Sequence, residues 1–132
     1  MPKLPTIFFL IASSTLAVIH IVSLELFLYW KYPLLDIPVH ALGGAVVALG
    51  IFTFKDLFPK YPSRLLYPIP VLSFVLLVAL VWEVYELKIG IPIEVDFEID
   101  TIMDLIMDIL GGIIGYIVGY SVSTLDLEHD TI

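Results

Sequence analysis

Acidic side chains and a histidine lie inside long apolar segments of this sequence, where such groups are rare. His40, Glu83, Asp104 and Asp108 each stand a helical turn or more from the nearest end of their apolar run. An ionisable group in a bilayer costs several kcal/mol unless it is paired, hydrated or bound to an ion. Helix capping does not explain residues at this depth, so we predict that these four side chains form a functional site.

Three further carboxylates, Asp36, Glu86 and Asp100, lie closer to the ends of the same apolar runs. We include them in the predicted site, although N-capping is an alternative role for Asp36 and for Asp100. Glu86, like Glu25, is near enough to a helix end to reach headgroup water. His20 is isolated in its segment and is expected to be a packing histidine rather than a ligand.

Carboxylate oxygens and one imidazole are ligands for a divalent cation. This set suits Mg²⁺, Mn²⁺ or Ca²⁺ and also accommodates Zn²⁺ or Fe²⁺. No Lys or Arg lies deep in the apolar runs, so either a metal balances these acids or several of them hold protons. We predict metal ligation by seven residues: Asp104, Asp108, Glu83, His40, Asp36, Glu86 and Asp100. His40 and Glu83 are also the candidate acid–base groups for catalysis.

The segments that carry these residues are long enough to cross a membrane. The chain has 132 residues, is 60% hydrophobic and has a mean hydropathy of +1.04. A spanning helix needs about 20 mostly apolar residues, and four segments qualify, at about 5–29, 37–54, 68–89 and 101–122. We predict one all-α domain over 1–132, a four-helix transmembrane bundle. The first segment is too long for a signal-peptide core and is expected to be retained.

Antiparallel helices would gather the polar residues into a cup at one membrane face. Asp100, Asp104 and Asp108 span only about 80° of the last helix, and Gly111 and Gly115 continue the same stripe. The second helix has a similar stripe, formed by Asp36, His40, Gly43, Val47 and Gly50. Because small residues let membrane helices approach closely, both stripes predict tight backbone packing below a carboxylate-lined cup.

Helical angles also indicate which of the remaining acids face the cup. Glu83 and Glu86 are about 60° apart on the third helix and can face the cup together. His20 and Glu25 are about 140° apart, so only one of them is expected to point inward.

The connections predict a topology and an orientation. Residues 93–100 alternate between apolar and acidic side chains, which indicates a short extended rim over the cup. Four helices place both termini and the second connection on one side, with Lys3, Lys55, Lys60 and Arg64. The other side holds two lysines. The excess of basic residues favours cytoplasmic termini in a multi-pass protein of the cell membrane.

The motifs that carry these residues resemble a known family. They read Asp36-Ile-Pro-Val-His40-Ala-Leu-Gly43-Gly44, Trp82-Glu83-Val-Tyr-Glu86, and Asp100-Thr-Ile-Met-Asp104-Leu-Ile-Met-Asp108-Ile-Leu-Gly111-Gly112. Together they resemble the YjdF-like membrane proteins and, more loosely, the VanZ-like group. The resemblance covers the last three helices and implies a small polytopic membrane protein without an assigned reaction.

Three functions are consistent with such a cup. The leading hypothesis is a metal-dependent hydrolase or transferase that acts on a lipid or polyprenyl phosphate from the extracytoplasmic face. The alternatives are a small cation or proton carrier and a structural or accessory subunit. The expected partners are membrane lipid and either a homo-oligomer or a larger membrane complex. Nucleic acid is disfavoured by the net charge of −8.

Overall fold

Long helices make up the fold. A computed structural model describes residues 3–89 and 97–129, and within these residues it contains helices and no strand, which confirms the predicted all-α class. Four helices of the described chain are long and apolar enough to span a membrane. They are α1 (Leu4–Glu25), α3 (Asp36–Leu57), α4 (Pro68–Ile89) and α5 (Phe97–His129). Short segments α2 (Leu28–Lys31), η1 (Pro33–Leu35) and η2 (Ser63–Leu66) lie in the connections.

The helix boundaries differ from the predicted ones at the end of the first helix and at both ends of the last, which continues from the predicted residue 122 to His129. The first spanning helix ends at Glu25, because Phe27 adopts a left-handed conformation with φ of 53° and starts the separate helix α2. The last helix starts at Phe97, so the prediction of an extended rim is wrong for residues 97–100. Glu98 and Asp100 lie in its first turn, where the helix dipole favours acidic side chains. The rest of the predicted rim, residues 93–96, lies outside the described residues.

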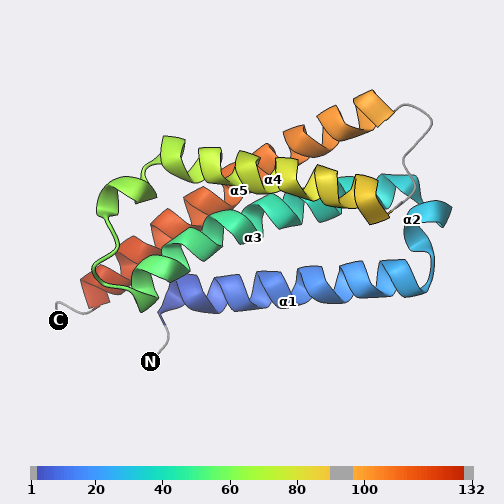
Figure 1. Ribbon diagram of the computed structural model, residues 1–132. Helices are drawn as coiled ribbons and strands as arrows, with labels where there is room; N and C mark the ends of the chain where they lie inside the picture. The colour runs from blue at the N-terminus through green and yellow to red at the C-terminus, as the bar shows by residue number, and fades with distance from the viewer. Residues whose placement is uncertain (1–2, 90–96, 130–132) are drawn as a thin grey trace.

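The helices run side by side with alternating direction (Figure 1). Both ends of the described chain lie at one end of the bundle with η2, whereas α2 and the start of α5 lie at the opposite end (Figure 1). Helix α3 occupies the centre, since it packs most extensively against α5 and also contacts α1 and α4. The predicted antiparallel succession of four spanning helices is therefore confirmed.

Glycines bring α3 and α5 into backbone contact. A Cβ atom on Gly111 would overlap the main chain of Ala41, one on Gly115 would overlap Ala45, and one on Gly44 would overlap the carbonyl of Asp108. The packing role predicted for Gly111 and Gly115 is confirmed.

The predicted glycine stripe of α3 has a different role. Gly43 and Gly50 have room for a Cβ in ordinary or slightly tight contact with side chains, and they line cavities. The face of α3 that meets α5 is rotated by one residue, to Gly44 and its alanine neighbours.

Candidate functional site

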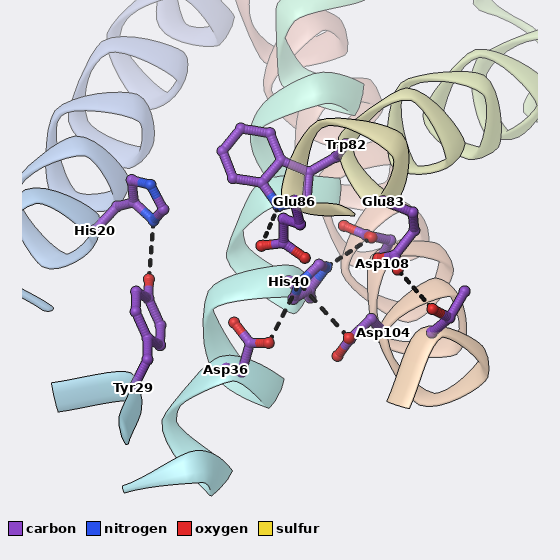
Figure 2. A network of polar contacts seen from close by, with 10 residues as sticks. His20, Tyr29, Asp36, His40, Trp82, Glu83, Glu86, Asp104 and Asp108 are labelled. Atoms are coloured by element: carbon purple, nitrogen blue, oxygen red, sulfur yellow. Dashed lines mark hydrogen bonds and ion pairs between the residues drawn. The ribbon is translucent and has the colours of Figure 1, made fainter. Parts of the chain in front are cut away.

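Buried polar side chains from three helices meet near the end of the bundle that holds α2. His40 lies in the second turn of α3, Glu83 lies near the end of α4, and Asp104 and Asp108 lie near the start of α5. Their exposed fractions are 4%, 7%, 3% and 6% in that order. Figure 2 shows His40 at the centre of this group, with the carboxylates around it. The four residues predicted from depth alone therefore converge.

The two nitrogens of the His40 ring have different partners. Nδ1 lies 3.0 Å from Oδ2 of Asp108. In the tautomer with its proton on Nδ1, the ring donates this hydrogen bond to the Asp108 side chain. Nε2 is buried and has no hydrogen-bond partner among the described residues. It lies 3.7 Å from Oδ2 of Asp36 and 3.9 Å from Oδ2 of Asp104, so acceptor atoms surround it.

The two glutamates of α4 each have one hydrogen-bonded oxygen. The Thr101 hydroxyl donates to Glu83 Oε2 at 2.8 Å, and the Trp82 indole N–H donates to Glu86 Oε1 at 2.8 Å. The second oxygen of Glu83 is buried without a partner in the described part of the chain. An oxygen held in this way is available to a cation or to a proton.

Two groups of side chains within the described residues have the geometry of a metal site. One contains Asp36, His40 and Asp104, and the other contains His40, Glu83 and Glu86. Within each group, one potential ligand atom from every residue lies within 4.8 Å of the others. Asp108 is in neither group, and its Oδ2 lies next to Nδ1 of His40. Asp100 is also outside both groups and lies half-buried in the first turn of α5.

A second polar network closes the cup on the α1 side. The Tyr29 hydroxyl lies within hydrogen-bond distance of His20 Nδ1, at 2.9 Å, and the His20 ring packs edge-on against Trp82. The left-handed turn at Phe27 sends the chain back so that Tyr29 reaches His20. Burial, together with the negative charge of Asp36, raises the pKa of Tyr29 to about 12, so its hydroxyl stays protonated at neutral pH.

Some of the alternatives that the sequence leaves open can now be decided. Glu25 is exposed and His20 is half-buried, which confirms that only one of the two points inward. His20 has a hydrogen-bond partner and a ring contact, as a packing histidine would. The N-cap alternative for Asp36 is wrong, because Leu35 occupies that position and Asp36 is the first residue of α3.

Sequence reasoning missed the side chains that hold the site in place. Tyr29, Trp82 and Thr101 position His20, Glu86 and Glu83 through single hydrogen bonds. Trp82 stands four residues before Glu86, a spacing that puts both on one helix face and offered a signal for this bond. The contacts of Tyr29 and Thr101 are made between segments and had no sequence signal.

The comparisons with known proteins agree with the membrane assignment. No curated protein and no solved structure matches the chain. The YjdF-like and VanZ-like resemblances therefore stay predictions. The model of one family, described as "Predicted membrane protein (DUF2238)", matches residues 2–124. Because this match covers most of the sequence, the chain belongs to this family of predicted membrane proteins.

Proposed function

We propose that this protein is a membrane-embedded, metal-dependent enzyme that acts on a lipid or polyprenyl phosphate from the extracytoplasmic face. The observation that carries the proposal is His40 Nε2, a buried nitrogen without a hydrogen-bond partner among the described residues, which faces two carboxylates. An imidazole lone pair and carboxylate oxygens repel one another unless a proton or a metal cation lies between them. A divalent ion bound by Asp36, His40 and Asp104 resolves this repulsion.

Asp108 is assigned a positioning role rather than direct ligation. Its carboxylate accepts the Nδ1–H of His40, which turns the lone pair of Nε2 toward the ion. A carboxylate that orients a metal-bound histidine in this way is common in metal sites and increases the basicity of the ligand. The carboxylate of Asp108 therefore acts on the metal through the ring of His40.

The reaction follows from the chemistry of the ion and of Glu83. A divalent ion held by Asp36, His40 and Asp104 would supply Lewis-acid chemistry, which polarises a phosphoryl oxygen and activates water. The second oxygen of Glu83 would accept the proton of the attacking water, while Thr101 holds the first oxygen. As the water oxygen bonds to phosphorus, the bond from phosphorus to the polyprenol oxygen breaks, and the alcohol leaves with the proton that Glu83 took up. Glu83 is therefore the proposed general base, and His40 the proposed ligand.

Glu83→Gln tests this division of roles. The substitution keeps the size of the side chain and its contact with Thr101 but removes the basic oxygen. We expect purified Glu83→Gln protein to bind a divalent ion and to release phosphate from a polyprenyl phosphate about 10²–10⁴-fold more slowly than wild type. Glu98→Gln, on an exposed acid of α5, is the matched control. Equal rates for wild type and Glu83→Gln would overturn the proposed base.

A proton or cation carrier is the second candidate. A doubly protonated His40 would also satisfy three carboxylates within 4 Å, which is the observation that favours it. The side chains that line the cavities toward the opposite end are mostly apolar, which disfavours a conducting path. Proteoliposomes that carry out pH- or voltage-driven cation uptake, lost in His40→Ala, would support the carrier over the enzyme.

The proposed orientation has its own test. The native chain has no cysteine, so a single introduced cysteine reports its own accessibility. Ser63→Cys in η2 should react only from the cytoplasm, and Leu34→Cys in η1, where the side chain is 77% exposed, should react only from outside. The reverse pattern would place the site at the cytoplasmic face.

A further inference from the structure

An apolar groove leads away from the site along the centre of the bundle. A cavity of about 350 Å³ lies between α1, α3 and α4, and its lining includes His20, His40 and Trp82. A second cavity of about 710 Å³ follows it toward η2 and includes Leu57 and Tyr61. The two adjoin, because both are lined by Val46, Val47 and Val78. We call them together the lateral groove.

The polarity of the lateral groove changes along its length. Near the site, its wall contains His20, His40, Trp82 and Asp108. Beyond them, most lining residues are apolar until Thr53 and Tyr61 near the opposite end. A molecule that fits this wall has one polar end and a long apolar body.

The length of the groove distinguishes between classes of lipid. On α3 the lining extends from Val39 to Leu57, which at 1.5 Å per residue is about 27 Å. The hydrocarbon core of a bilayer is about 30 Å thick, so one leaflet supplies about half of that. A chain that fills the groove therefore passes the bilayer midplane, which the chains of ordinary two-chain phospholipids do not need to do.

Glycines keep the groove open. Gly43 and Gly50 line it, and a Cβ on either would meet only side chains, those of Asp108 and Phe9, in ordinary or slightly tight contact. Each of the two cavities has a volume within the range of typical small-molecule sites, about 300–1,000 Å³.

We propose that the lateral groove binds the single long hydrocarbon chain of a polyprenyl-type lipid, with the polar end of the lipid at His40. The identity of that polar end, a phosphate, rests on the proposed function. The chain site itself rests on the groove and does not require a metal. It predicts one lipid per protein chain, bound in a fixed register.

Lipid binding to the detergent-purified protein tests the proposal, with the bound species counted by native mass spectrometry. The probe is undecaprenyl monophosphate, and the comparison lipids are undecaprenol, farnesyl monophosphate and a two-chain phosphatidic acid. We expect one undecaprenyl monophosphate per chain, with weaker binding of farnesyl monophosphate and phosphatidic acid. Phosphatidic acid that binds as well as undecaprenyl monophosphate would overturn the long-chain assignment.

A pair of substitutions on one helix places the lipid. Val78→Trp puts a large ring into both cavities, whereas Val81→Trp makes the same change at a position that is 62% exposed. Because the ring displaces several methylene groups of the lipid, we expect Val78→Trp to weaken binding about tenfold or more and Val81→Trp to leave it unchanged. Leu16→Trp, from the α1 wall, repeats the block if Val78→Trp does not fold.

The remaining outcomes each decide one part of the proposal. If Val78→Trp and Val81→Trp weaken lipid binding equally, the lipid binds nonspecifically at the protein surface. This result would overturn the proposed site in the lateral groove. If the wild-type protein is a dimer and Val78→Trp makes it monomeric, a second copy of the chain fills the groove. This result would also overturn the proposed lipid site. Undecaprenol that binds as well as the phosphate and is blocked by Val78→Trp would support the chain site but contradict the proposed function.

Discussion

The two ends of the bundle are held together in different ways. At the end with α2, His40 and the surrounding carboxylates are buried, and hydrogen bonds and ion-pair distances connect α3, α4 and α5. At the opposite end, Ala48, Ile51, Val71 and Val75 form an apolar core beside the lateral groove. Helix α3 therefore changes from polar contacts near His40 to apolar packing along its length.

This difference follows from the membrane environment. Lipid tails are as apolar as the side chains, so helices in a bilayer associate through close packing and polar contacts rather than through burial from water. The glycine contacts of α3 with α5 supply the close packing and leave the acids at the cup in a fixed arrangement. The close packing of α3 with α5 accounts for stability, whereas the buried acids have a cost that we attribute to function.

The largest expected effect on stability is at the glycine contact. Gly111→Ala places a methyl group on the main chain of Ala41, so the helices must separate, and we expect a loss of about 1–3 kcal/mol in the free energy of unfolding. Gly43→Ala is the control, since its Cβ would lie 3.5 Å from the nearest atom. The control should be unchanged or up to about 1 kcal/mol more stable. Denaturation in mixed micelles measures both, and equal stabilities would contradict the packing account.

The next largest effect concerns the metal. Asp108→Asn keeps an oxygen that accepts the Nδ1–H of His40 but removes the charge that strengthens the ligand, so affinity for the ion should fall about 10–100-fold. Asp56→Asn changes a carboxylate at the apolar end, where Asp56 accepts a hydrogen bond from Thr6, and should leave metal affinity unchanged. Metal titration of both variants is the measurement. If Asp108→Asn and Asp56→Asn lose the same metal affinity, the total negative charge of the protein, and not the position of Asp108, determines that affinity.

The smallest effect is at the corner between α1 and α2. Tyr29→Phe removes the hydrogen bond to His20 and should cost about 1 kcal/mol, whereas Tyr67→Phe, at a position 66% exposed, should cost nothing measurable.

The same hydroxyl predicts a dependence on pH. Burial raises the pKa of Tyr29 from 10.0 to about 12. Between these values the folded state binds more protons than the unfolded state, so this contribution is complete below pH 10 and is lost as pH rises toward 12. Between pH 10 and 12, the free energy of unfolding should fall more steeply for wild type than for Tyr29→Phe. Parallel curves for the two proteins would contradict the raised pKa of Tyr29.

Sequence reasoning found the four long apolar helices and the gathering of polar side chains near one end of the bundle, because hydropathy and charge are local properties. It also found Gly111 and Gly115, because they continue the stripe of Asp104 and Asp108. It did not find which face of α3 meets α5, since Gly43 and Gly44 differ by one residue and both faces contain small side chains. The distinct position of Asp108, on the far nitrogen of His40, depends on how the ring is turned and has no sequence signal.

The extended rim was predicted because apolar and acidic side chains alternate over residues 93–100, and the last four of these residues belong to the start of α5. For residues 97–100, acidic side chains in the first turn of a helix outweigh the alternating pattern. A short run with period 2 therefore does not distinguish a strand from the start of an amphipathic helix.

The metal content of the purified protein decides whether His40 and its carboxylates form a metal site. Wild type and Asp104→Asn are purified without chelators, and bound metal and melting temperature are measured together on each sample. We expect about one divalent ion per wild-type chain, no bound ion in Asp104→Asn, and a lower melting temperature for the variant when metal is supplied. A metal-free wild type, with Asp104→Asn equally or more stable because a buried acid has been removed, would contradict the metal site.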